Sequence, residues 1–120
     1  MSGTVAKHMD TTGREGPDIF RAAREDDLRE LQAALREGQS LRSAWLDTGL
    51  TPVHIAAIRG SVNFLRVAME QDPQSAWIQD VQLRLAFAHA AVRKDRQSMA
   101  LLHNAMYPEA SIPVPESQFG

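Results

Sequence analysis

The sequence predicts an all-α fold of three stacked helix-turn-helix units, and three observations support this. Alanine pairs recur every 34 residues, at Ala22–Ala23, Ala56–Ala57 and Ala90–Ala91. Good helix N-caps recur at the same spacing, at Asp27, Ser61 and Asp95. Apolar residues follow each cap at mostly helical spacing. A fixed period is typical of units that bury an apolar face only against their neighbours, so each unit is predicted to contain a short helix, a tight turn and a longer helix.

The first unit spans about residues 17–46. Asp26 stands at the turn between its two helices. Asp27 is followed three residues later by Glu30, a spacing typical of a capping box.

The second unit, about residues 47–78, carries the clearest helix signals in the segment TPVHIAAIRG. Thr51 suits an N-cap, Pro52 suits the first helical position, and Gly60 can end the helix at positive φ. A helix of about two turns is unstable alone, so it must pack against a neighbour. The small side chain of Ala57 predicts a close helix–helix contact.

The third unit, about residues 79–107, departs most from this pattern. Leu85 and Ala86 replace Thr51 and Pro52, and Lys94 replaces Gly60. Because a lysine at positive φ is unfavourable by about 1 kcal/mol, the turn at Lys94 is expected to be reshaped.

The spacing before the third unit also differs from the 34-residue repeat. The segments SAWL and SAWI, at residues 43–46 and 75–78, lie 32 residues apart, so two extra residues precede the third alanine pair. We infer that Asp80 caps a helix that begins early, near Val81, and that the last loop is shortened or lost.

The two ends differ in composition from the repeats. Residues 1–16 are polar and aperiodic, which predicts disorder. Residues 108–120 are rich in proline and are expected to form an extended tail. This tail either folds back over the apolar residues Met99, Leu102 and Met106, the interpretation we favour slightly, or it serves as a docking peptide or linker.

The segment DTGLTPVHIAAIRGSVNFLRVAM, Asp47–Met69, resembles an ankyrin repeat. Asp18–Gly38 resembles an amino-terminal ankyrin repeat, and Ala86–Leu102 resembles a degenerate third one. The resemblance implies a solenoid of antiparallel helix pairs with short β-hairpin fingers between repeats. It also implies that Thr51 and His54 satisfy backbone groups, and that partners bind to the fingers and to the concave face of the inner helices.

The composition argues against several classes of protein. The net charge is −2, with both signs spread evenly along the chain, so no basic stripe for nucleic acid is present. No apolar run is long enough for a signal peptide or a membrane span, which favours a cytoplasmic location and leaves signal-less secretion open. The chain has no cysteine, and its eleven arginines against two lysines hint at a bacterial source.

No motif for catalysis or for a cofactor is present. The four histidines are His8, His54, His89 and His103. No two of them are three or four residues apart, so a zinc site is not expected. We therefore predict no catalytic residue, no cofactor and no metal, and an enzyme is the remote alternative.

The repeat register instead predicts a partner-binding surface. It places an apolar pair, Ile58 and Val92, beside Arg59 and Arg93 on the concave face, unless neighbouring repeats cover them. Such a strip suits an apolar patch with an acidic rim. Finger residues and two tryptophans at similar repeat positions complete the predicted site: Trp45, Asp47, Thr48, Leu50 and Trp77. The tryptophans are either ligand contacts or packed on the adjacent hairpin.

The function expected from the sequence is thus a small ankyrin-repeat module that binds one protein partner as an adaptor, an inhibitor or an immunity factor. The alternative is a structural module that forms a homodimer through an end repeat.

Overall fold

The computed structural model describes residues 16–116. The regular secondary structure of these residues is helical, and they contain no strand. The α-helices are α2 (Ile19–Glu25), α3 (Leu28–Arg36), α4 (Pro52–Arg59), α5 (Val62–Gln71), α6 (Ala86–Arg93) and α7 (Arg96–Met106). Two 3₁₀ helices, η1 (Pro73–Trp77) and η2 (Pro108–Ala110), follow α5 and α7. The predicted all-α class is confirmed, whereas residues 1–15, for which disorder was predicted, lie outside the described part.

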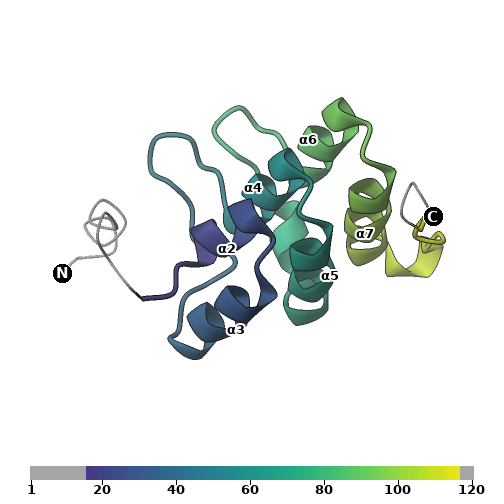
Figure 1. Ribbon diagram of the computed structural model, residues 1–120. Coiled ribbons are helices and arrows are strands. Elements are labelled where there is room, and N and C mark those ends of the chain that lie inside the picture. The colour runs from purple at the N-terminus through teal and green to yellow at the C-terminus, as the bar shows by residue number, and fades with distance from the viewer. Residues whose placement is uncertain (1–15, 117–120) are drawn as a thin grey trace.

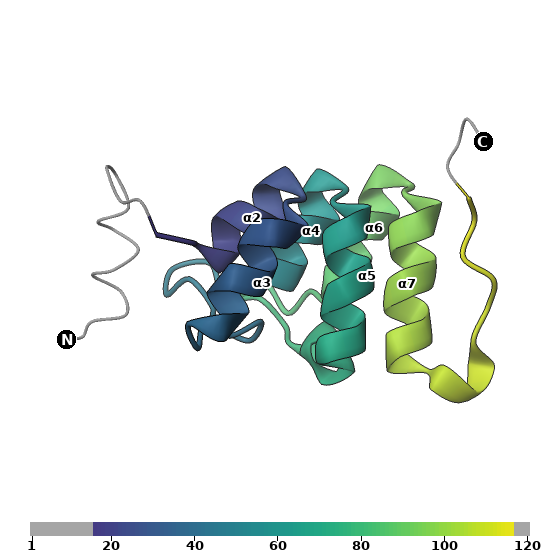
Figure 2. The ribbon, with the colours of Figure 1, turned by 60° about the horizontal axis from the view of Figure 1, so that its bottom comes forward.

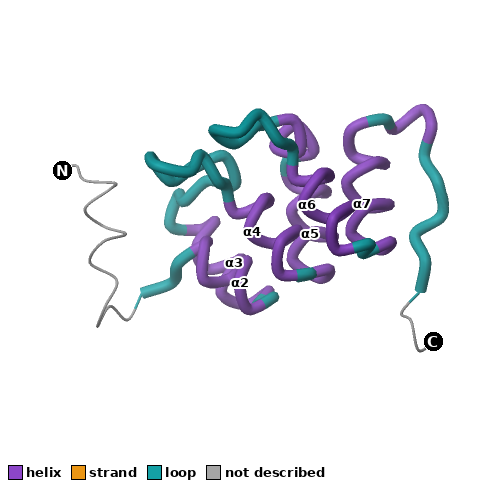
Figure 3. The backbone as a smooth tube through the Cα atoms, turned by 90° about the horizontal axis from the view of Figure 1, so that it is seen from above, coloured by secondary structure: helices purple, strands orange, loops and turns teal. Residues whose placement is uncertain are grey.

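The helices form two rows. The inner row consists of α2, α4 and α6, in which each helix packs on the next, and the outer row consists of α3, α5 and α7. Figures 1 and 2 show the three helix pairs side by side in chain order, with the loops after α3 and η1 projecting together. The same loops lie along one edge in Figure 3.

The turn inside each helix pair has one conformation throughout the chain. Asp26, Gly60 and Lys94 each end a helix of the inner row in the left-handed conformation, with φ of 55°, 76° and 59°. In all three turns the N–H of the next residue donates a hydrogen bond to the carbonyl oxygen of the first alanine of the repeated alanine pair. The expected reshaping at Lys94 is therefore wrong, because these helix-ending bonds are the same with lysine as with glycine.

The caps of the outer helices are only partly as predicted. Asp27 and Asp95 accept the expected backbone bonds from Glu30 and from Ser98. The Asp27 capping box is incomplete, because the Glu30 carboxylate accepts from the Asp18 N–H and pairs with Arg21 instead.

Ser61 precedes α5 but does not cap it with its side chain. Its hydroxyl donates across the inner row to the Ala23 carbonyl oxygen at 2.5 Å. The left-handed Asp26 of the preceding unit caps α5 instead, because its carboxylate accepts from the Phe64 N–H at 2.6 Å. Successive units are therefore joined by side-chain bonds to backbone as well as by apolar packing.

One continuous apolar core runs between the two rows. Ala22, Ala23, Ala56, Ala57 and Ala90 are fully buried within the inner row. Phe20, Leu31, Phe64, Leu65 and Leu102 supply most of the bulk. Small residues on the inner row let its backbones approach closely, whereas the large side chains fill the space toward the outer helices.

Replacing Ala57 with leucine is expected to lower the free energy of unfolding by about 1–3 kcal/mol, because the site has no room for added methylenes. Urea unfolding followed by circular dichroism measures this change. Ala44→Leu, at an exposed loop position, is the control and should change stability by less than about 0.5 kcal/mol. An equally small change at Ala57 would contradict the tight packing of the inner row.

The two projecting loops, residues 37–51 and 78–85, replace the β-hairpins that were expected. The first loop closes through a bond from the Trp45 N–H to the Leu50 carbonyl oxygen, and the second through a bond from Asp80 to Arg84. A single bond, from the Val81 N–H to the Thr48 carbonyl oxygen at 3.0 Å, joins the two loops. With so few backbone hydrogen bonds within and between them, the two loops do not form β-strands.

The early start predicted for the third inner helix is also wrong. The helix α6 begins at Ala86, in register with Pro52 of α4, and the second loop is retained. Asp80 does not cap a helix. Its carboxylate accepts bonds from the N–H groups of Gln82 and Arg84 within the loop.

Gly49, at the tip of the first loop, is required by both conformation and space. Its φ is 72°, and a Cβ there would lie 2.8 Å from the Val81 backbone nitrogen. Gly60 also has positive φ, but its Cβ would meet only the movable Arg93 side chain. We expect Gly49→Ala to cost about 2 kcal/mol and Gly60→Ala about 1 kcal/mol in chemical unfolding, since a backbone contact cannot be relieved by a rotamer change. Equal costs would contradict the contact between the loops.

The described part of the tail folds back along α7, as the favoured interpretation expected. The Asn104 side chain exchanges two bonds of 2.8 Å with the Ile112 backbone, and Gln97 donates to the Pro115 carbonyl oxygen. Val114 packs against the core. Figure 2 shows this segment beside α7, on the side away from α5.

Candidate binding surface

The residues predicted on the inner row differ in accessibility. Val92 on α6 is 83% exposed, whereas Ile58 on α4 is only half-buried. Arg59 and Arg93 are both exposed, and Arg93 donates to the Ile58 carbonyl oxygen at 3.3 Å. The predicted apolar strip is therefore present mainly at Val92, with arginines beside it.

The two tryptophans have different environments. The Trp45 ring lies 4.9 Å from the Phe20 ring and packs against the core, so packing accounts for it. Trp77 is 40% exposed and its ring meets the Tyr107 ring edge-on at 5.4 Å. Of the pair, Trp77 therefore offers the more accessible contact.

The predicted residues of the first loop divide in the same way. Asp47 is exposed, whereas Thr48 and Leu50 are half-buried and the Thr48 hydroxyl accepts from the Leu50 N–H at 3.2 Å.

The sequence did not identify three strongly exposed apolar residues of the loops. These are Leu46 at 80%, Val81 at 60% and Leu83 at 72% exposed.

Leu83 lies at the tip of the second loop with a φ of 64°, which is rare for a leucine. It lies 34 residues after Gly49, so the two loop tips share the left-handed conformation and the repeat register. This register was the signal that could have identified Leu83. Strained residues persist where surrounding bonds impose them, and they are frequent at binding sites.

Asp80 supplies the hydrogen bonds that hold Leu83 in its left-handed conformation. Its buried carboxylate accepts from the N–H groups of Gln82 and Arg84 at 2.9 Å each and from His89 Nε2 of α6 at 3.1 Å. Burial alone would raise the pKa of the Asp80 carboxyl, but the bonds from Arg84, His89 and Gln82 outweigh it and hold that pKa well below its usual range. A carboxylate charged at neutral pH thus fixes the second loop to the inner row.

His54 holds the same loop from α4. Its Nδ1 accepts from the Thr51 N–H at 3.1 Å, so the ring proton lies on Nε2 and is donated to the Arg84 carbonyl oxygen at 3.0 Å. The Thr51 hydroxyl accepts from the His54 N–H, which completes a capping box. Burial lowers the pKa of His54, so this histidine is neutral and structural.

The described part of the chain contains no group of three metal-ligating side chains. None of the helices described is long and apolar enough to cross a membrane. No protein-family model matches the chain, and no curated protein matches it.

Proposed function

We propose that this chain is a small ankyrin-repeat protein that binds one protein partner, as an adaptor, an inhibitor or an immunity factor. The repeat assignment is supported by the 34-residue register of the three left-handed turns and by the bond from His54 to the next loop. The inner row and the two loops correspond to the surface through which ankyrin repeats bind their partners.

The observation that carries the binding proposal is where the most exposed large apolar side chains lie. Within residues 16–116, four such side chains are at least 60% exposed, namely Leu46, Val81, Leu83 and Val92. All four lie in the two loops or on the inner row, and none lies on α3, α5 or α7. Exposing these apolar side chains to water is unfavourable, so a partner that covers them gains free energy from their burial.

The predicted partner presents an apolar patch with acidic groups at its rim, because Arg59 and Arg93 lie beside Val92 in the repeat register. Val92→Asp should weaken the complex at least about tenfold, mainly through faster dissociation. Charge reversal at Arg59 and Arg93 should mainly slow association and alter its salt dependence, with little effect on the melting temperature.

The test captures partners from an extract of the source cells on the immobilised chain, with Val92→Asp and Arg66→Asp in parallel. Arg66 is exposed on the outer helix α5 and provides the matched control. A partner retained by the wild type and by Arg66→Asp, but lost from Val92→Asp, supports the proposal, and its dissociation constant is then measured with purified proteins. Equal retention by all three chains would contradict it. A dimer in light scattering that Val92→Asp abolishes would instead favour self-association.

A further inference from the structure

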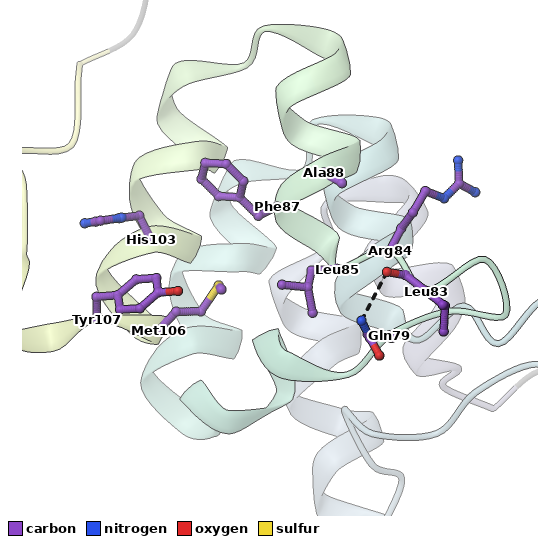
Figure 4. A pocket seen from close by; sticks show the side chains of 9 residues that line it. All are labelled: Gln79, Leu83, Arg84, Leu85, Phe87, Ala88, His103, Met106 and Tyr107. Carbon is purple, nitrogen blue, oxygen red and sulfur yellow. Dashed lines mark hydrogen bonds between the residues drawn. The ribbon is translucent and has the colours of Figure 1, made fainter.

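The carboxy-terminal end of the helix stack has an open apolar pocket of about 460 Å³. It lies between the second loop, the start of α6 and the end of α7, as Figure 4 shows. Leu83, Leu85, Phe87, Ala88, Met106 and Tyr107 line most of it. A pocket of this size and composition can hold bulky apolar groups of a ligand.

The repeat register shows why this surface is open. Thr51, Val53 and His54 of α4 and its cap are fully buried, because the third unit covers them. The residues 34 positions later are Leu85, Phe87 and Ala88, and all three are only half-buried. The pocket is therefore the site at which a further helix would pack on α6, as α6 packs on α4.

The tail closes only half of this end. Residues 110–115 bond to α7 through Gln97, His103 and Asn104, and so cover the end of the outer row. In Figure 2 the tail occupies the place beside α7 that a next outer helix would take. Within the described residues, nothing takes the corresponding place beside α6.

The chemistry of the pocket favours an apolar helix over another repeat of the same kind. Between α4 and the second loop, His54 Nε2 donates to the Arg84 carbonyl oxygen. The corresponding residue of α6 is Ala88, and Leu85 replaces the capping Thr51, so this unit lacks the side chains that would hold a following loop. Leu85, Phe87 and Met106 offer apolar contact alone.

The charges of the third unit define the polar flank of the occupant. Of the four exposed cations of this unit, Arg84 lines the pocket and also pairs with Asp80 at 3.3 Å, whereas Arg93, Lys94 and Arg96 lie at the opposite end of α6. The carboxylates of this unit, Asp80 and Asp95, are both engaged in internal hydrogen bonds. Among the nine residues that line the pocket, none is acidic. Acidic groups beside the apolar face of the occupant would therefore be favoured.

We propose that this pocket docks an amphipathic α-helix of a partner protein, with an apolar face on Phe87 and Met106 and acidic residues on its flanks. The helix extends the inner row by one member, so the docking surface continues an interface already formed twice within the chain. The pocket shares Leu83 with the surface proposed above and adjoins Val92, but its apolar floor at Phe87 and Met106 is not part of that surface, and the proposal does not depend on the function proposed above.

The test uses the full chain and a synthetic peptide of about 16 residues, long enough for four helical turns, with leucine and alanine on one face and glutamate on the other. Fluorescence anisotropy gives the dissociation constant. We expect Phe87→Gln and Met106→Gln each to weaken binding at least about tenfold. Leu46→Gln is the matched control, because Leu46 is an exposed apolar residue of the first loop that does not line the pocket, and it should change binding less than about twofold.

Several outcomes would overturn the proposal. A scrambled peptide, or one with lysine in place of glutamate, that binds equally well would remove the requirement for an acidic amphipathic helix. Loss of binding in Val92→Asp but not in Phe87→Gln would place the peptide on the inner-row strip. A dimer that Phe87→Gln dissociates would make a second copy the occupant. A spin label at His8→Cys or Phe119→Cys that broadens the Met106 methyl signal in the monomer would assign the pocket to the chain's own terminus.

Discussion

Replacing Asp80 with alanine is expected to lower the free energy of unfolding by about 3 kcal/mol, because it removes a buried acceptor shared by several donors. The N–H groups of Gln82 and Arg84 would lose their acceptor, and so would His89 Nε2. Leu83 would then be released from its left-handed conformation. Chemical unfolding measures the loss, and faster amide exchange in residues 80–85 would localise it.

Asp47→Ala is the matched control, because Asp47 is an exposed carboxylate in the first loop. It should change stability by less than about 0.5 kcal/mol. A similar small effect at Asp80 would show that its hydrogen bonds are replaced by water at no cost, and would contradict its role in holding the second loop.

The same carboxylate predicts a pH dependence. The pKa of Asp80 is lower in the folded protein than in the unfolded chain, so its stabilising effect is complete above the unfolded pKa of about 4. That effect is lost as the pH falls below this value toward the folded pKa. Asp80→Asn should therefore lose less stability than the wild type between about pH 4 and pH 2. An equal loss of unfolding free energy in the two proteins over this pH range would contradict the prediction.

The features that the sequence predicted correctly depend on local chemistry. Thr51, Pro52 and Gly60 begin and end α4 at the expected residues, because caps act on backbone groups within one turn. The burial of Ala57 also followed from the pattern, since stacked units repeat their contacts at the same register. Neither feature requires knowledge of distant residues.

The features that were missed depend on contacts between units. Asp80 is typical of a helix N-cap in sequence, yet it is bound by its own loop and by His89 on the following helix. Ser61 likewise donates to the Ala23 carbonyl oxygen, which only the close approach of α2 and α4 brings within reach. For Trp45 the sequence left open a ligand contact or packing on the adjacent hairpin, and its contact with Phe20 depends on the stacking of the first unit. A local pattern does not determine such partners.

His54→Ala is expected to destabilise the fold by about 3 kcal/mol or more, since the side chain is buried and joins α4 to the second loop. Its loss would leave a cavity and an unpaired Thr51 N–H, and the Arg84 carbonyl oxygen would keep only its bond from the Asp80 N–H. Chemical unfolding measures the change. An effect below about 1 kcal/mol would show that the bond to Arg84 is dispensable for stacking the third unit.

His54 also predicts that stability falls on mild acidification. Burial makes the pKa of His54 lower in the folded protein than the unfolded value of about 6.5, so the unfolded chain binds the proton first. The stabilising effect of neutral His54 is complete above about pH 6.5 and is lost as the pH falls from there toward the folded pKa. Protonation at Nδ1 would set a donor against the Thr51 N–H and break the capping box. Unfolding curves at pH 7 and pH 5 should therefore differ more for the wild type than for His54→Gln, and an NMR titration should give His54 a pKa below 6.5. A His54 pKa at or above that value would mean that the ring is solvated and that the joint between α4 and the second loop opens in solution.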